Sequence, residues 1–266
     1  MNNIDIGKET IRITKDKKYS INSKEIHLPD LDYTKVIVVS PNKGKEMTGK
    51  GCSEYKNENM CKIKIVNSDS FQAGRNYDNP LVMNFANAHH PGGGFLLGAN
   101  AQEEALCRCS TLYASLTSRA ASEMYQYNNS RISKVESDYM LLSPNVAVFR
   151  DEKCILLESV NIMGVITVPA PNRRGAAFLA SKELIKETFI RRIRILLLAA
   201  ANYGYKNLVL GAWGCGAFGN DPKDVAEYFK YVLIDEEYGK CFDEVCFAIY
   251  GSENGKNITA FRKAFS

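Results

Sequence analysis

The residues Gln102, Glu103 and Glu104 follow three consecutive glycines after a spacer of seven residues. Glycine has no Cβ, so such a run can take positive φ values and bring its backbone N–H groups close to an anion. A diphosphate suits this kind of loop, particularly where a helix begins just after it. Burial and a bound anion would both raise the pKa of a neighbouring carboxyl group, which could then protonate a leaving oxygen. The pattern predicts an anion-binding loop beside an acid–base carboxyl group; the glycines are Gly92, Gly93 and Gly94.

Each half of this pattern also has a simpler explanation. Acidic residues in the first turn of a helix stabilise its dipole without catalysing anything. A glycine triplet on its own is more often a flexible turn. The two halves occur together here, and this combination favours the chemical interpretation.

A second glycine-rich segment, residues 211–220, follows a short apolar run. Its small residues could expose backbone N–H groups to the same anion, or they could form a tight turn between a strand and a helix. Trp213 beside them either lines a cleft or anchors the core. The candidate binding residues of this segment are Gly214, Cys215, Gly216, Ala217 and Phe218.

Metal binding is not expected. His89 and His90 are adjacent, so they cannot easily chelate one ion, and no acidic or cysteine partners occur at a useful spacing. Cys107 and Cys109 are two residues apart and would point in different directions on a helix. The sequence predicts no metal and no cofactor, and activity should survive chelation.

Apolar runs alternate with amphipathic segments from about residue 61 onward. Strands are predicted at residues 62–66, 81–85, 208–210 and 245–249, and helices at residues 70–75, 102–121, 179–203, 222–233 and 257–265. Continuous apolar strands between such helices predict a three-layer α/β/α fold whose sheet is covered on both faces. Ligands bind at the carboxyl ends of strands in sheets of this kind. Both glycine segments follow predicted strands.

The N-terminal sixty residues have a less regular pattern. Residues 3–13 are ambiguous between helix and strand, residues 19–28 predict a hairpin, and residues 42–59 are polar and predicted to form a loop. We therefore expect an N-terminal accessory segment at residues 1–60 and a catalytic domain at residues 61–266. With 45% hydrophobic and 24% charged residues, the composition is that of a folded globular chain.

The glycine run, its spacer and Gln102-Glu103-Glu104 together resemble the signature of poly(ADP-ribose) glycohydrolases of the compact microbial type. The segment at residues 211–220 is similar to the second diphosphate loop of that family, and residues 81–94 resemble the asparagine-containing strand and loop of macrodomains at large. The resemblance extends from about Cys61 to the C-terminus. It implies a macrodomain-like fold with a mixed central sheet.

The resemblance also implies roles for individual residues. Glu104 would be the general acid and base, Glu103 would hold ribose hydroxyl groups, and Gln102 would help to fix the loop. Phe218 would stack on the terminal ribose or adenine, with a core position as the alternative. The remaining binding candidates are Asn87 for the distal ribose or a turn, Asp69 for the adenine amino group or a helix cap, and Tyr250 after the last strand.

The function implied is cleavage of ribose–ribose O-glycosidic bonds in poly(ADP-ribose), with ADP-ribose as the product and chain ends as the preferred sites. Two alternatives are removal of a single ADP-ribose from proteins and a macrodomain that binds ADP-ribose without catalysis. The paired glutamates argue against a pure binding domain, which needs no general acid. No apolar run approaches the roughly 20 residues that span a bilayer, and the first residues do not form a signal peptide. We expect a cytoplasmic monomer without membrane contact.

Overall fold

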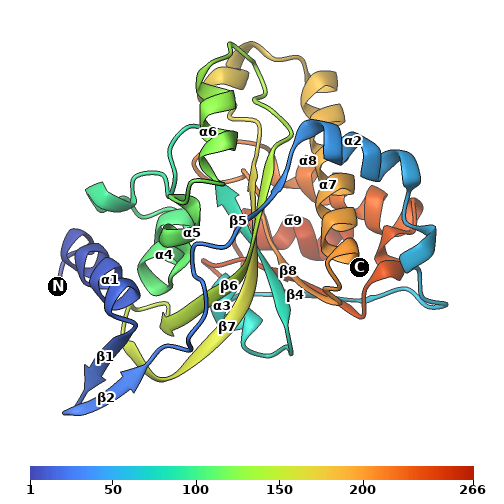
Figure 1. Cartoon of the computed structure of the whole chain (residues 1–266). Coiled ribbons are helices and arrows are strands. Elements are labelled where there is room, and N and C mark those ends of the chain that lie inside the picture. Colours follow the sequence, from blue (N-terminus) through green and yellow to red (C-terminus); the bar gives the residue numbers. More distant parts are fainter.

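The computed structural model describes all 266 residues, and a seven-stranded mixed sheet forms its centre (Figure 1). The strand order across this sheet is β3-β6-β7-β5-β8-β9-β4. Helices cover both faces, so the predicted three-layer arrangement is confirmed. The strands are β3 (Ile37–Val39), β4 (Lys62–Val66), β5 (Pro80–Ala86), β6 (Met140–Arg150), β7 (Leu156–Pro169), β8 (Asn207–Leu210) and β9 (Glu244–Ala248).

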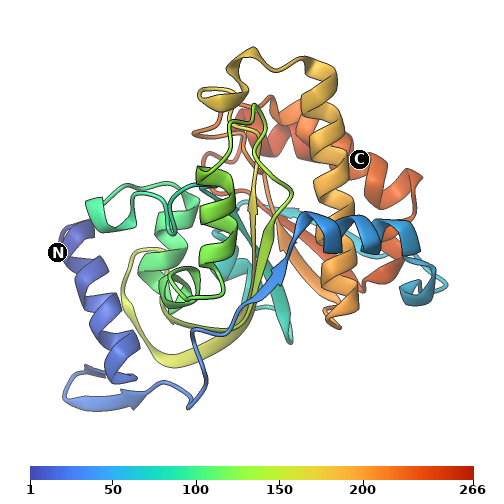
Figure 2. The ribbon, with the colours of Figure 1, turned by 45° about the horizontal axis from the view of Figure 1, so that its top comes forward.

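Alternate side chains of each central strand enter different cores, because successive residues of a strand point to opposite faces. On β5, Leu81 and Met83 belong to one core and Val82 to the other. The first core is covered by α2 (Pro41–Lys50), α7 (Lys182–Asn202), α8 (Pro222–Lys230) and α9 (Lys256–Ala264). The second is covered by α3 (Ser70–Gly74), α4 (Gln102–Cys109), α5 (Leu112–Leu116) and α6 (Ser122–Asn129), as Figure 2 shows from another side.

Five neighbouring strands, β7, β5, β8, β9 and β4, run parallel to one another. Their carboxyl ends therefore meet at one edge of the sheet. The loop at residues 87–94 follows β5 at this edge, and the loop at residues 211–220 follows β8. The parallel order thus brings the two glycine segments together.

The N-terminal part packs against the half of the long antiparallel pair β6–β7 that lies next to the turn joining these two strands (Figure 1). It contains α1 (Asn3–Asp16) and the hairpin of β1 (Lys18–Ile21) and β2 (Lys24–His27). The ambiguous segment at residues 3–13 is helical, and the Asn2 side chain caps it by accepting from Asp5 N at 2.9 Å. The boundary near residue 60 stays a prediction; β3, which precedes it, forms an edge strand of the central sheet.

Two predictions about local structure are wrong. The helix predicted at residues 102–121 is broken after Cys109, because Ser110 is extended and forms a bridge with Val148, while Thr111 N donates to Ala147 O at 3.0 Å. Pairing with β6 therefore outweighs the helical pattern. Part of the predicted loop at residues 42–59 is helix α2, which Ser40 caps and Pro41 begins.

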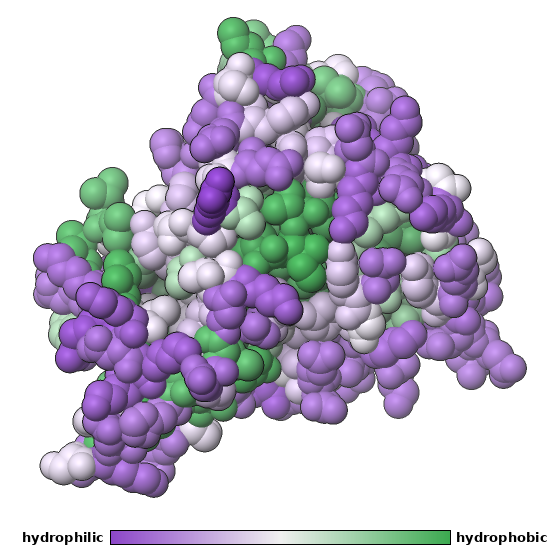
Figure 3. Space-filling view, in the orientation of Figure 1, coloured by the Kyte–Doolittle hydropathy of each residue, from purple (hydrophilic) through white to green (hydrophobic).

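The molecular surface in Figure 3 is mostly polar. Its apolar patches include one over the start of α1 and the short turn Phe95–Leu97, where Leu97 is largely exposed, and one over the turn Ala176–Leu179. None of the helices is both long and apolar enough to cross a membrane.

Candidate active site

Glu103 lies in the first turn of α4 and is almost completely buried, with 3% of its surface exposed. One carboxylate oxygen accepts from Asn84 Nδ2 at 3.2 Å, and the other accepts from the backbone N–H of Asn87 at 2.8 Å. Burial disfavours the charged form and raises the pKa of Glu103 to about 8, although both hydrogen bonds oppose this shift. Glu103 is therefore mainly protonated at neutral pH in the free protein.

Glu104, the next residue, has 8% of its surface exposed. Its Oε2 accepts from the backbone N–H of Ala101 at 3.0 Å, which satisfies a free donor at the start of α4. Its Oε1 accepts from the backbone N–H of Gly94 at 2.9 Å. Glu104 thus fixes the end of the glycine loop to the helix that carries both carboxyl groups.

The glycine loop has to be made of glycine where it passes these carboxyl groups. Gly92 and Gly93 have φ values of +70° and +56°, which other residues rarely adopt. A methyl group on Gly93 would lie 2.4 Å from Glu104 Oε1 and 3.2 Å from Glu103 Oε2. Both carboxyl groups therefore approach the loop at this one residue. Gly94 has an ordinary φ of −91°, so the loop has two residues in the left-handed region and not three.

Gln102 fixes the start of α4 to the end of β5. Its side-chain oxygen accepts from Phe85 N at 2.9 Å, and its Nε2 donates to Met83 O at 2.8 Å and to Ser70 Oγ at 3.2 Å. These three bonds tie α4 to the central strand and to α3. The position of both glutamates relative to the sheet depends on them.

The second glycine loop is held by Asn220. Its Nδ2 donates to Pro171 O at 2.9 Å and to Gly214 O at 3.0 Å, and its backbone N donates to the same Gly214 oxygen at 3.1 Å. Gly216 and Ala217 are exposed at the turn, whereas Cys215 is buried in the core. Cys215 therefore packs between the loop and the core and does not line the cleft. Burial raises the pKa of its thiol.

The two loops and α4 enclose a cavity of about 580 Å³. Its wall includes Asn87, Glu103, Glu104, Gly214, Gly216 and Phe218. A second cavity of about 350 Å³ adjoins it, with Phe85, Gln102 and Gly216 in the wall of both. The result is one elongated cleft whose size is typical of a nucleotide-binding site. The carboxyl groups lie at one end, and Asp69 and Tyr250 at the other.

The remaining predicted residues lie in or beside this cleft. Asp69 caps α3 through Oδ1, which accepts from Phe71 N at 2.9 Å and Gln72 N at 3.0 Å, so Oδ2 has no such partner. Asn87 forms a turn, since its Oδ1 accepts from the backbone N–H groups of the next two histidines at 2.9 and 3.0 Å. Phe218 is half-buried, and Tyr250 is 77% exposed. The roles predicted for these residues in ligand binding stay predictions.

Asn84 contacts the candidate site, and the sequence analysis missed it. It is fully buried in β5, and its Nδ2 is shared between Glu103 Oε1 at 3.2 Å and Thr167 Oγ1 at 3.1 Å. A buried amide in the middle of an apolar strand is costly unless it has partners. That unusual polar residue within residues 81–85 is the signal that could have identified it.

The geometry decides between the two interpretations of Trp213. It is a core anchor and not a cleft residue, because it is completely buried and its Nε1 donates to Val168 O at 3.0 Å.

No group of three or more His, Cys, Asp or Glu side chains has the geometry to hold a metal ion.

Comparison with known proteins identifies similar families and structures. Residues 7–151 match the family described as microbial-type PARG, catalytic domain. The crystal structure of poly(ADP-ribose) glycohydrolase from Thermomonospora curvata is 35% identical, with 99% of each chain covered and a TM-score of 0.92. The same enzyme bound to the inhibitor ADP-HPD is 35% identical, with 98% of each chain covered and a TM-score of 0.89.

A third similar structure is that of poly(ADP-ribose) glycohydrolase from Deinococcus radiodurans in complex with ADP-ribose. It is 33% identical, the match covers 90% of this chain and 98% of that one, and the TM-score is 0.82. None of the curated proteins compared with the chain matches it.

Proposed function

The chain belongs to the microbial-type poly(ADP-ribose) glycohydrolase family, and we propose how its cleft carries out the hydrolysis of poly(ADP-ribose) to ADP-ribose. The enzyme is a glycosidase that cleaves the ribose–ribose O-glycosidic bond. The observation that carries the mechanism is the approach of both carboxyl groups to Gly93, beside a cleft whose wall includes these carboxyl groups, Asn87 and the second glycine loop.

Glu104 is the general acid and base in this mechanism. It donates a proton to the departing ribose oxygen as positive charge develops on the anomeric carbon, and then takes a proton from the attacking water. Its position beside Gly93 and Gly94 supports this role, because a diphosphate held by those residues would place the adjoining ribose next to its carboxyl group. No metal is required for such proton transfers.

Glu103 has a different role, which its surroundings support. Burial raises its pKa to about 8, so it carries a proton at neutral pH and does not add a second negative charge beside the diphosphate. A protonated carboxyl group can also donate a hydrogen bond to a ribose oxygen. Asn84 keeps Glu103 in position for this contact.

The rest of the cleft accommodates one ADP-ribose unit. The exposed N–H groups of Gly216 and Ala217 bind the diphosphate directly. In the first loop the ligand has to replace the contacts of Gly93 N with His90 O and of Gly94 N with Glu104 Oε1. Phe218 packs against a ribose or the adenine. Asn87 Nδ2 is not used by the turn and is available to the distal ribose. The free Oδ2 of Asp69 accepts from the adenine amino group, with Tyr250 nearby in the same cavity.

The resemblance to compact microbial members of the family implies attack at chain ends. We extend the proposal to the exo preference, a macrodomain-type ancestry, a monomeric state, a cytoplasmic location and an accessory role of residues 1–60. Product analysis during digestion tests the first of these, because an exo enzyme releases ADP-ribose from the start and no short oligomers.

The decisive experiment compares wild type with Glu104→Gln on labelled poly(ADP-ribose). Losing a general acid and base reduces kcat by about 10²–10⁴-fold. The dissociation constant for ADP-ribose should change far less, because the amide is nearly the same size and its oxygen can still accept from one of the two backbone N–H groups that Glu104 contacts. Glu104→Asp should be crippled too, since its shorter side chain misplaces the acid. Glu227→Gln, an exposed change on α8, is the matched control. Near wild-type release of ADP-ribose by a folded Glu104→Gln enzyme would contradict the assignment.

Substrate choice is tested with the same enzymes. Wild type is offered poly(ADP-ribose) and, separately, a protein carrying single ADP-ribose groups. Release from the polymer at a much higher kcat/KM supports the proposal. A higher kcat/KM on the singly modified protein would indicate a mono-ADP-ribosyl hydrolase, and binding without any release would indicate a non-catalytic domain.

A further inference from the structure

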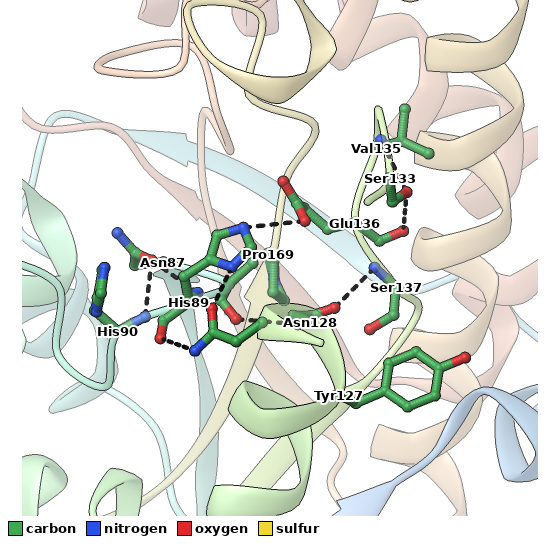
Figure 4. A network of polar contacts seen from close by, with 12 residues as sticks. Asn87, His89, His90, Tyr127, Asn128, Ser133, Val135, Glu136, Ser137 and Pro169 are labelled. Carbon is green, nitrogen blue, oxygen red and sulfur yellow. Dashed lines mark hydrogen bonds and ion pairs between the residues drawn. The ribbon is translucent and has the colours of Figure 1, made fainter. Parts of the chain in front are cut away.

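His89 lies in the loop at residues 87–94 and is bound by groups outside the cleft (Figure 4). Its Nδ1 is 2.7 Å from Asn129 Oδ1, and its Nε2 is 3.1 Å from Glu136 Oε2. Asn129 ends α6, and Glu136 lies in the segment that leads from α6 to β6. Both ring nitrogens of one histidine therefore face oxygen atoms of the same neighbouring unit.

The hydrogen-bond pattern decides how many protons the ring carries. Asn129 Nδ2 donates to the backbone oxygen of His89 at 3.1 Å, which fixes the orientation of the Asn129 amide. Its oxygen therefore faces Nδ1, and an oxygen of this kind only accepts. Nδ1 must then donate. Nε2 faces Glu136, and an ionised carboxyl group only accepts, so Nε2 donates as well where Glu136 is the anionic partner.

The surroundings of Glu136 favour it as the anionic partner of His89. Only 6% of its side chain is exposed, compared with 37% of that of His89, and a buried carboxylate needs a nearby cation. The guanidinium of the buried Arg192 also acts on Glu136 and donates to Val135 O, next to it in the chain. The backbone of Glu136 has a φ of +61°, an unfavourable conformation for a residue other than glycine. A side chain with a specific contact explains why glutamate occupies such a position.

This contact faces away from the catalytic carboxyl groups. The loop is tied on one side to α4 by Glu103 and Glu104, through the N–H groups of Asn87 and Gly94. On the other side α6 holds it: Asn128 Nδ2 donates to Ala88 O at 3.0 Å. The ring of His89 adds an ionic contact on that second side, two residues after Asn87.

We propose that His89 is a positioning residue, protonated on both ring nitrogens and ion-paired with Glu136, which fixes the diphosphate-binding loop. This inference rests on the proposed function of the loop. The carboxylate of Glu136 balances the charge of the ring, so the contribution of His89 is positional: the two ring contacts reduce the disorder that ligand binding would otherwise have to overcome. His89 touches no reacting atom in this scheme, so its contribution belongs to binding more than to the chemical step.

The first test is spectroscopic. Long-range 15N–1H correlation spectra of the wild-type protein at pH 7 should show protons on both ring nitrogens of His89, whereas Glu136→Gln should show one. A wild-type ring with a single protonated nitrogen would overturn the ion pair.

The second test separates binding from catalysis. His89→Gln and Glu136→Gln should each weaken ADP-ribose binding and raise KM by about tenfold, the loss of one charge-assisted hydrogen bond, with kcat changed by less than about twofold. The double variant should resemble the singles, because both remove the same contact. His27→Gln is the matched control, since it removes an exposed histidine–glutamate pair in the β1–β2 hairpin, away from the cleft.

The outcomes distinguish this inference from the proposed function. An unchanged KM in both folded variants would overturn the positioning role while leaving the glycosidase mechanism intact. A wild-type protein that binds no ADP-ribose would overturn the proposed function, and the spectra would still decide the protonation of His89. If His89→Gln unfolds, Glu136→Gln supplies both readouts.

Discussion

Replacing Gly93 by alanine tests the geometry on which the mechanism depends. A methyl group there would lie 2.4 Å from Glu104 Oε1, whereas contacts of a Cβ under 3.0 Å essentially do not occur. The carboxyl group must therefore move by at least about 0.6 Å, the difference between these two distances. The hydrogen bond from Gly94 N to the same oxygen, now 2.9 Å, would be distorted by that movement.

Two separable losses follow from this one substitution. A left-handed backbone costs a non-glycine residue roughly 1–2 kcal/mol, which for a chain of this size lowers the melting temperature by about 2–8 °C. A displacement approaching 1 Å in a catalytic group can reduce the rate by about 10²-fold. Gly93→Ala should therefore fold, melt several degrees earlier and lose about 99% of its activity.

Gly204→Ala is the matched control for the backbone term alone. Gly204 also has a positive φ, +79°, but a methyl group there would meet no atom within 4 Å, and it lies after α7, away from the cleft. It should melt earlier by a similar amount and keep wild-type kcat/KM on labelled poly(ADP-ribose). The reasoning would be refuted if Gly93→Ala were as active as Gly204→Ala at equal stability.

Three further predictions concern other parts of the site. Because the pKa of Glu103 is raised from 4.5 to about 8, the native state binds more protons than the unfolded state between these values. The free energy of unfolding should therefore fall as pH rises from about 4.5 to 8. Urea unfolding at pH 5, 6.5 and 8 should show a smaller fall for Glu103→Gln than for wild type, and an equal fall in both proteins would contradict the raised pKa. Asn220→Ala removes two hydrogen bonds from the second loop. Urea unfolding should show a loss of about 1–3 kcal/mol in the free energy of unfolding, and calorimetry should show weaker binding of ADP-ribose. Activity measured after exhaustive chelation should stay within about twofold of the untreated enzyme; loss that one added cation restores would show a metal requirement.

The sheet and its covering helices could be predicted from the sequence because their apolar residues follow a local pattern. Residues 62–66 are the clearest case, since the predicted and observed strands coincide. Breaks caused by tertiary contacts could not be predicted. The helix ends before Ser110 because Ser110 forms a β-bridge with Val148 of β6. Residues 102–121 alone contain no signal for this distant partner. The start of α2 was a missed local signal, since Ser40 followed by Pro41 is a common helix start.

The candidate site also has one part that could be predicted from the sequence and one part that could not. The glycines and the glutamates could be found because their spacing is local, but the contacts that hold the buried Glu103 could not. One of them comes from Asn84, which lies 19 residues before Glu103 and contacts it across the packing of α4 on β5. Asp69 and Asn87 each combine a capping or turn role with a place in the cleft wall, so such a structural role does not rule out a contact with a ligand.

The contacts of Glu104 determine what a ligand in the glycine loop has to displace. In the free protein the two oxygens of Glu104 accept from two backbone N–H groups, those of Gly94 and Ala101. A diphosphate oxygen in the glycine loop would compete with Glu104 Oε1 for the N–H group of Gly94. We therefore expect ligand binding to break the contact between Gly94 and Glu104 while the contact with Ala101 keeps the side chain in place, which would free one carboxyl oxygen to face the leaving ribose.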